Sequence, residues 1–255
     1  MILGFIGTGK IASSVITGIC NSDIKYKKII ISSRNKKVAL SLKKKFKKII
    51  ISKINQEIID KSDWVFLSVT PSVGEKIIKD LKFRTNQKVI SFISTITLSQ
   101  LKKMIKKKID IVRAIPLPPI SLREGPVPIC PPNKKVKAFF DKLGSTVEIK
   151  NEKLSINFWS TSGMMASYYN MLDTMSAWLN KKGVKKLDAQ KYVTSLFLAL
   201  SKDAVINSDK DLKLLVKDSQ TPKGLNEQGL KEMIKKDVYK SLINSLNSIY
   251  KRLDK

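Results

Sequence analysis

The sequence predicts an α/β protein in two parts, a doubly wound parallel sheet over residues 1–150 and an all-helical part over residues 151–255. Short apolar runs of strand length alternate with amphipathic stretches in the first part, which is typical of a parallel sheet with helices on both faces. In the second part, apolar residues recur every three or four positions, which is the spacing of helices with one apolar face. At 255 residues, the chain is long enough for a core in each part.

Apolar runs in the first part predict the strands of the sheet. We expect parallel strands at residues 2–6, 28–33, 48–52, 64–69, 88–93 and 109–115, with helices between them. Asn35 and Ser62 mark helix boundaries, and Thr97 or Ser99 is expected to cap the helix after the fifth strand.

A proline-rich segment ends this regular pattern. Residues 116–119 read Pro-Leu-Pro-Pro, and proline can continue neither a helix nor a central strand, so the chain is expected to turn away from the sheet. Beyond it we expect edge strands at residues 127–129 and 145–149 around a short helix at 134–143.

Three apolar stripes predict long helices in the second part, interrupted at Gly183 and at residues 221–224. The stripes are Met165, Tyr168, Leu172, Met175 and Leu179; Val193, Leu196 and Leu200; and Leu242, Leu246, Ile249 and Leu253. Because little chain remains to cover them, we expect burial against another copy, in a homodimer or higher homo-oligomer. Packing within one chain is the alternative.

A glycine motif opens the chain, after its first predicted strand and before its first predicted helix. Gly7 permits a tight turn, Gly9 lets the backbone approach a pyrophosphate, and small Ala12 lets the helix pack closely. The start of the helix directs free N–H groups at the anion. The motif predicts a Rossmann-type dinucleotide site, the alternative being an ordinary turn. The expected phosphate-binding residues are Gly7, Thr8, Gly9, Lys10 and Ile11.

The end of the second strand indicates which dinucleotide binds. An acidic residue there commonly binds the ribose diol of NAD, but this chain has Ser33 and Arg34, and Asp23 is poorly placed to substitute. A guanidinium beside a hydroxyl suits a 2′-phosphate, so we expect NADP(H) rather than NAD(H). Alternatively, Arg34 is only a surface residue at a helix start. Ser94 follows the fifth strand at the carboxyl edge of the sheet, where ligands bind in this fold.

The charge of the chain suggests a nucleic-acid binder, but its distribution does not. The formal net charge is +28, and lysines are spread over every segment without interleaved aromatic residues. Arginine, the residue suited to bidentate phosphate and base contacts, is scarce. We therefore expect no nucleic-acid partner, although the positive field would attract a phosphorylated cofactor or a carboxylate substrate.

Other compositional features exclude further classes. Histidine is absent, which argues against zinc sites, metal binding in general and histidine triads. Cys20 and Cys130 form no CxxC pair and are expected to be reduced thiols. No apolar run approaches the roughly 20 residues of a membrane helix, so we expect no membrane association and a cytoplasmic location.

Several of these segments together resemble the pyrroline-5-carboxylate reductase family, enzymes that make proline with NADPH. Residues 4–18 (GFIGTGKIASSVITG) are similar to its glycine motif and first helix. Residues 63–71 resemble its fourth strand, whose Val-Lys-Pro end near the nicotinamide corresponds here to Val69, Thr70 and Pro71. Residues 112–116 are similar to its Val-Arg-x-Met-Pro segment.

The resemblance also implies substrate-binding segments in the helical part. Residues 162–168 correspond to the family's Gly-Ser-Gly-Pro-Ala-Tyr, and residues 221–227 to its Ser-Pro-Gly-Gly-Thr-Thr. Both depart from the pattern. Methionines replace small residues, and Asn226 falls on the threonine implicated in holding the substrate. Leu117 replaces an asparagine and Thr70 a lysine. The implied substrate residues are Met164, Met165, Gly224, Leu225 and Asn226.

The leading interpretation is reduction of a cyclic imino acid, 1-pyrroline-5-carboxylate, to proline by hydride transfer from NADPH. A cyclic imine suits a chain without histidine, because its nitrogen can be protonated before it binds. Backbone N–H groups of residues 224–226 could bind the carboxylate, and Thr221 or Asn226 could cap that helix or touch the ligand. Tyr168 could donate a proton or be a core residue. Arg113 could bind a carboxylate but is expected to be a structural clamp.

Two other functions remain open at this point. Bulky Met164, Met165 and Leu117 are compatible with a related NADP-dependent reductase of another imine or of a small carbonyl compound. A regulatory or nucleic-acid-binding protein that binds a cofactor without catalysis is the alternative from another class. The direction of flux is also open.

Overall fold

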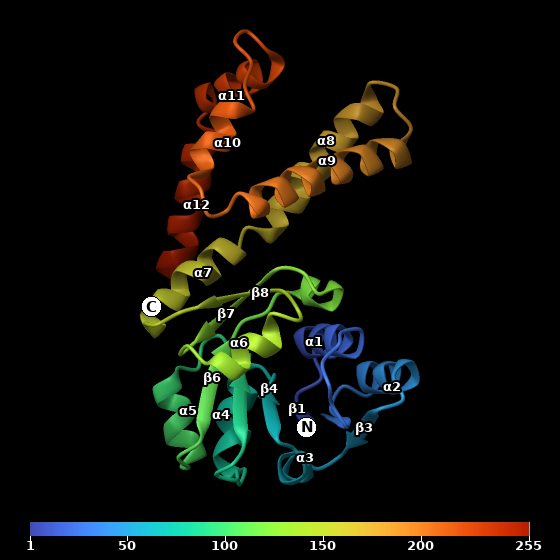
Figure 1. The fold of residues 1–255 in the computed structure, drawn as a ribbon, viewed down its shortest axis with the longest axis vertical. Helices are drawn as coiled ribbons and strands as arrows, with labels where there is room; N and C mark the ends of the chain where they lie inside the picture. Colours follow the sequence, from blue (N-terminus) through green and yellow to red (C-terminus); the bar gives the residue numbers. More distant parts are fainter. Residues whose placement is uncertain (255) are drawn as a thin grey trace. The chain divides into compact units, whose positions relative to one another are not determined.

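The structure is a computed structural model that describes residues 1–254, and the chain divides into two compact units, residues 1–155 and 156–255. In Figure 1 the first unit runs from blue to yellow-green and contains the sheet, and the second runs from yellow to red and is helical. The predicted fold class is confirmed for both parts.

The first unit contains one eight-stranded sheet in the order β3-β2-β1-β4-β5-β6-β7-β8. The strands are β1 (Ile2–Ile6), β2 (Lys28–Ser32), β3 (Ile49–Ser52), β4 (Trp64–Leu67), β5 (Lys88–Ser91), β6 (Asp110–Ala114), β7 (Pro126–Cys130) and β8 (Ser145–Glu148). From β3 to β6 all neighbours are parallel. The strand order reverses between β1 and β4, and ligands bind at the carboxyl ends of the strands at such a point.

Helices connect the strands of this unit. They are α1 (Lys10–Cys20), α2 (Lys36–Lys45), α3 (Asn55–Lys61), α4 (Pro71–Ile77), η1 (Ile78–Asp80), α5 (Leu98–Ile105), η2 (Pro118–Leu122), α6 (Lys134–Phe140) and η3 (Glu152–Leu154). Asn35 caps α2, Ser62 ends α3, and Thr97 caps α5 in a capping box with Gln100, as the sequence predicts.

Two apolar clusters cover the two faces of the sheet. Leu3 and Phe5 of β1 pack in one cluster with side chains of α1, α2 and α6. Ile6 of β1 packs in the other cluster with side chains of α3 and α5. Because successive side chains of a strand point to opposite faces, this division makes the sheet doubly wound.

The sheet departs from the parallel pattern at its end, where β7 runs antiparallel to β6. β7 and β8 were both expected at an edge, but β7 lies between β6 and β8, and of these two strands only β8 is at an edge. Pro128 does not prevent this position, because its carbonyl accepts a hydrogen bond from the N–H of Ile115 at 3.1 Å. The expectation was wrong because a proline lacks a donor but keeps its acceptor.

The second unit is built from helices. They are α7 (Ser155–Ser162), which begins at the last residue of the first unit, α8 (Met165–Lys181), α9 (Lys186–Ile206), α10 (Leu212–Asp218), α11 (Leu225–Lys235) and α12 (Val238–Leu253). Gly183, at φ +96°, turns the chain between α8 and α9. Among residues 1–254, no helix is long and apolar enough to cross a membrane.

Candidate nucleotide-binding site

The turn after β1 requires glycine at its first position. Gly7 has φ +98°, and a Cβ there would lie 2.5 Å from the carbonyl oxygen of Ser68. The N–H of Ser68 donates to the carbonyl of Ile6 at 2.8 Å, and its hydroxyl donates to the carbonyl of Gly7 at 2.7 Å. The turn is therefore packed directly against the chain that leaves β4.

Ser32, the last residue of β2, ties the glycine turn to the second strand. Its hydroxyl accepts a hydrogen bond from the N–H of Gly7 at 3.0 Å, and its carbonyl accepts one from the hydroxyl of Thr8 at 2.6 Å. Ser32 and Thr8 are both buried. The side chain of Thr8, predicted to contact the cofactor, is thus engaged in holding the turn, while its backbone still borders the cavity described below.

The first turn of α1 supplies an anion-binding surface. α1 begins after Gly9, and no side chain caps its first N–H groups. A Cβ on Gly9 would meet nothing within 4 Å, so open space lies over the start of the helix. The N–H groups of Lys10 and Ile11 belong to this first turn, where a helix leaves its donors available and carries a partial positive charge.

A cavity of about 420 Å³ opens beside this turn. It is lined by Gly7, Thr8, Gly9, Arg34, Asn35, Lys36, Ser68, Val69 and Thr70. None of these lining residues is acidic, and Arg34 and Lys36 supply two cations at the end of the second strand. The turn, the helix start and the cations suit a dinucleotide that carries an additional phosphate.

The cavity gathers part of the set predicted from sequence. Gly7, Thr8, Gly9, Arg34, Val69 and Thr70 line it; Lys10, Ile11, Ser33, Pro71 and Ser94 do not. Of the residues that do not line it, Pro71 is the first residue of α4 and the N–H of Ser33 donates to the carbonyl of Ser52. Lys36, Asn35 and Ser68 also line the cavity and were not predicted, although Lys36 stands only two residues after Arg34.

Ser94 belongs to a second network at the carboxyl edge of the sheet. The buried guanidinium of Arg113, on β6, donates to the carbonyl of Ser94 and to the carboxylate of Glu152. The same carboxylate accepts from the N–H of Leu98, in the first turn of α5, at 2.8 Å. Burial raises the pKa of the neighbouring Cys130 thiol, and the charge of Glu152 adds to this effect. Arg113 is therefore a structural clamp, as expected.

The predicted substrate residues of the helical unit lie in two segments. Met164 immediately precedes α8 and Met165 begins it, both half-buried. Tyr168 is 41% exposed on α8, and its ring lies edge-on to Phe197 at 6.3 Å, so within this chain it is not the core residue considered as an alternative.

The second segment precedes α11 and differs from two expectations. Neither Thr221 nor Asn226 caps the helix: Gly224 holds the cap position, and the side-chain amide of Asn226 donates to the carbonyl of Ser219 at 2.8 Å. The N–H of Gly224 is not a free donor either, because it donates to the carbonyl of Thr221 at 2.8 Å. A tight turn before α11 thus uses groups that were expected to contact a ligand.

Glu227 places a carboxylate of the chain itself at this helix start. Its side chain accepts from the N–H of Lys223 at 2.5 Å and pairs with Lys231 at 2.6 Å. The hydrogen bond from Lys231 lowers the pKa of Glu227. Glu227 and Lys231 line a cavity of about 480 Å³ with Gly224, whereas Leu225 and Asn226 are not among its lining residues.

Both parts of the chain match models of known protein families. Residues 2–96 match the family model described as NADP oxidoreductase coenzyme F420-dependent, and residues 153–255 match the model described as pyrroline-5-carboxylate reductase dimerisation. Pyrroline-5-carboxylate reductase 2 of Bacillus subtilis is 21% identical over 98% of this chain and 93% of its own length. The chain belongs to the pyrroline-5-carboxylate reductase family. As a member of the pyrroline-5-carboxylate reductase family, it is an NAD(P)H-dependent oxidoreductase.

Solved structures of the family share the fold. The Streptococcus pyogenes 1-pyrroline-5-carboxylate reductase aligns with a TM-score of 0.82 at 23% identity, covering 99% of this chain and 98% of that one. The Plasmodium falciparum pyrroline carboxylate reductase with NADP bound aligns with a TM-score of 0.83 at 22% identity, covering 99% and 97%. Among residues 1–254, no cluster of three or more His, Cys, Asp or Glu residues could hold a metal ion.

Proposed function

We propose that this chain reduces 1-pyrroline-5-carboxylate to proline, with NADPH as the hydride donor, and so serves proline biosynthesis. The observation that carries the cofactor assignment is the cavity at the glycine turn, where Arg34 and Lys36 stand in place of an acidic residue. The reaction is supported by family membership and by relatives named pyrroline-5-carboxylate reductase that align along nearly the whole chain.

We assign the following roles in cofactor binding. The N–H groups of Lys10 and Ile11 bind the pyrophosphate over the open space at Gly9, as in other helix-start anion sites. Arg34, with Ser33 and Lys36 beside it, binds the 2′-phosphate. Val69, Thr70, Pro71 and Ser94, all at the carboxyl edge of the sheet, border the nicotinamide half. NADPH supplies the hydride, and the chain positions the donor and excludes water.

We assign the substrate site to the two helical segments. Met164, Met165, Gly224, Leu225 and Asn226 form the substrate-binding set, and Tyr168, Thr221 and Asn226 are the candidates for direct participation in the reaction. Tyr168 carries a hydroxyl on an exposed ring, which makes it the candidate proton donor. The carboxylate of the substrate needs donors. The N–H of Gly224 is engaged by the carbonyl of Thr221, so we assign this role to N–H groups of the first turn of α11.

One observation favours a second candidate within the same class. The two methionines at 164 and 165 and Leu117 are larger or less polar than the family residues that they replace, and such changes reshape a pocket. A related NADP-dependent reductase of another imine or of a small carbonyl compound is therefore the alternative. Membership of an oxidoreductase family favours both enzymatic proposals over a protein without catalysis.

We further propose that the chain acts as a homodimer through its helical unit. Large apolar side chains are exposed on every helix from α8 to α12, including Trp178 at 59% and Ile243 at 54%. Residues 153–255 also match the family's dimerisation model. A second copy that covers these side chains would remove apolar surface from water, which favours association.

The deciding experiment measures NADPH oxidation by the purified full chain with 1-pyrroline-5-carboxylate and, in parallel, with cyclic imines of other ring sizes and small carbonyl compounds. Saturable turnover with the five-membered imine, and with NADPH well above NADH, is the expected result. Turnover with another compound but none with 1-pyrroline-5-carboxylate would establish the alternative. NADPH binding measured without substrate separates failure of the cofactor assignment from failure of the substrate assignment.

A further inference from the structure

A second and larger cavity lies at the opposite edge of the sheet from the glycine turn. It measures about 920 Å³ and lies at the amino ends of β4, β5 and β6. Trp64, Lys88 and Asp110, the first residues of these three strands, line it. The nucleotide cavity lies at the carboxyl ends of β1 and β4. Because these strands are parallel, the two cavities lie at opposite ends of the strands.

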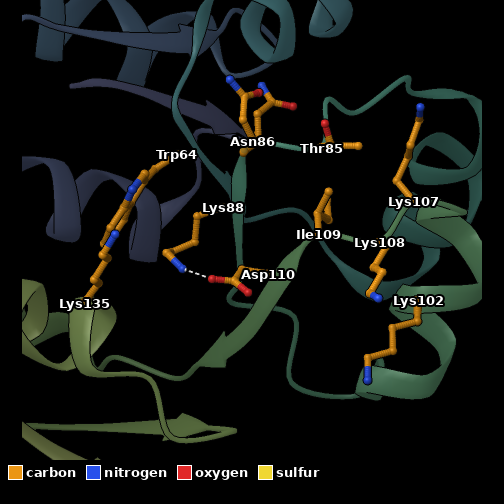
Figure 2. Close-up of a pocket in the computed structure, with 11 residues that line it drawn as sticks. Trp64, Thr85, Asn86, Lys88, Lys102, Lys107, Lys108, Ile109, Asp110 and Lys135 are labelled. Carbon is orange, nitrogen blue, oxygen red and sulfur yellow. Dashed lines mark hydrogen bonds and ion pairs between the residues drawn. The ribbon is translucent and has the colours of Figure 1, made fainter.

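Lysines from four different parts of the first unit converge on this cavity. Lys88 begins β5, Lys102 lies on α5, Lys107 and Lys108 lie in the turn between α5 and β6, and Lys135 lies on α6. Figure 2 shows Lys102, Lys107 and Lys108 on one side and Lys135 with Trp64 on the other, with Lys88 between them. We propose that this cavity binds a small anion with several linked phosphates, an oligophosphate.

The charge balance of the cavity supports an anionic ligand. Asp110 is the only acidic residue among those that line it, and it pairs with Lys88, whose side chain is more than nine-tenths buried. The hydrogen bond from Lys88 lowers the pKa of Asp110, so this carboxylate stays ionised at neutral pH. The other four lysines have no acidic counterpart in the lining, so the cavity carries a net positive charge. A concave surface with charges of one sign concentrates its field on a bound ion.

Polar and aromatic groups complete the lining. Thr85 and Asn86, in the turn before β5, add a hydroxyl and an amide to the rim. The indole of Trp64 packs against Phe139 at 5.0 Å, and the ammonium of Lys88 lies 5.9 Å from its ring. The lysine run at residues 106–108 has no aromatic neighbour in the sequence, but the fold brings Trp64 to the same cavity. An oligophosphate attached to a base would find a stacking surface there.

The arrangement differs from the other lysine runs of the chain. Lys43, Lys44 and Lys45 end α2, are exposed, and line none of the cavities described above. They offer three charges without a concavity, as many as the cavity variant described below replaces, so they provide a matched comparison.

The test is titration calorimetry of the full chain with sodium tripolyphosphate at about 0.15 M salt, where long-range attraction to exposed charges is screened. The cavity variant carries Lys102→Gln, Lys107→Gln and Lys108→Gln, and the control carries Lys43→Gln, Lys44→Gln and Lys45→Gln. All six side chains are exposed, and thermal unfolding checks that both variants fold. We expect saturable binding with one site per chain, weakened about tenfold or more in the cavity variant and less than about twofold in the control.

Repeating the titration with saturating NADPH locates the site, since binding that NADPH leaves unchanged lies away from the glycine turn. ATP in place of tripolyphosphate, with and without Trp64→Phe, distinguishes a nucleotide from an inorganic chain as the source of the phosphates. No saturable binding, competition with NADPH, or equal weakening in both lysine variants would overturn the proposal. If the chain binds an oligonucleotide and both lysine variants weaken that binding equally, anion binding is a property of the whole lysine-rich surface and the proposal is overturned.

Discussion

At the scale of single residues, Ser32 explains how the glycine turn is held in shape. From the end of the neighbouring strand, its hydroxyl accepts from the N–H of Gly7 and its carbonyl accepts from the hydroxyl of Thr8. The two hydroxyls also lie 3.2 Å apart, and all three interactions are buried. Glycine-rich turns have high conformational entropy when unfolded, so fixed partners are needed to order them. The backbone that we propose to bind the pyrophosphate is therefore held by fixed partners without a ligand.

The two glycines of the motif are expected to respond differently to alanine. Gly7→Ala places a Cβ against the Ser68 carbonyl at a left-handed φ, so we expect a loss of more than about 2 kcal/mol of folding free energy. Gly9→Ala meets open space at an ordinary φ, so stability should change by less than about 1 kcal/mol while NADPH binding weakens severely. Urea denaturation and NADPH titration measure the two effects. Unimpaired NADPH binding by Gly9→Ala would contradict the phosphate site.

Arg34 should discriminate between the two nicotinamide cofactors. Arg34→Ala removes the charge-assisted hydrogen bond that we propose to the 2′-phosphate, so NADPH binding should weaken by about 1–2 kcal/mol while NADH binding hardly changes. Calorimetric titration of both cofactors measures this. Lys37→Ala is the matched control, because Lys37 is an exposed cation in the first turn of α2, shortly after Arg34, but does not line the cavity. Equal losses for NADPH and NADH would refute the assignment.

At the scale of elements, a buried arginine fixes the start of α5 and the segment before it. Arg113 joins β6 to the Ser94 carbonyl and to Glu152 of η3, and Glu152 also accepts from the first turn of α5. The capping box of Thr97 and Gln100 satisfies further N–H groups at the same helix start. One carboxylate thus supports three elements at the edge where the nicotinamide is proposed to bind.

Removing the carboxylate of Glu152 should lower the free energy of unfolding more than removing an exposed carboxylate does. Glu152→Ala removes the carboxylate that pairs with the Arg113 guanidinium, which is only 3% exposed, and we expect a loss of about 3 kcal/mol of folding free energy. Glu75→Ala, at an exposed position of α4, should change stability by less than about 0.5 kcal/mol. Chemical denaturation of both variants measures the difference. Equal stability of the two variants would show that the clamp contributes little.

At the scale of the whole molecule, the strands and helices follow from local sequence, whereas their long-range partners do not. The apolar runs predicted the ends of β1 to β6 to within two residues, because buried strands and amphipathic helices have distinct periods. The position of β7 inside the sheet depends on which neighbour its carbonyls reach, and no local pattern encodes that.

The candidate sites show the same division. The glycine motif and Arg34 were recognisable because their chemistry lies in consecutive residues. Lys36, Ser68 and the Ser32 contacts were missed because they depend on the packing of β2 and β4 beside β1. The turn before α11 was misjudged because Gly224 holds the cap position and donates its N–H to the carbonyl of Thr221, and because Glu227 accepts from the N–H of Lys223.

The exposed apolar surface of the helical unit should determine the oligomeric state. Leu242 and Ile243 of α12 are 41% and 54% exposed, and a charged residue in a buried interface is costly. We expect the native chain to sediment at twice the mass of one chain, and Leu242→Glu with Ile243→Glu to sediment as a monomer. Leu40→Glu, at a 60% exposed position on α2, should stay dimeric. Circular dichroism checks that the helices persist, and a double variant that remains dimeric with intact helices would place the interface elsewhere than α12.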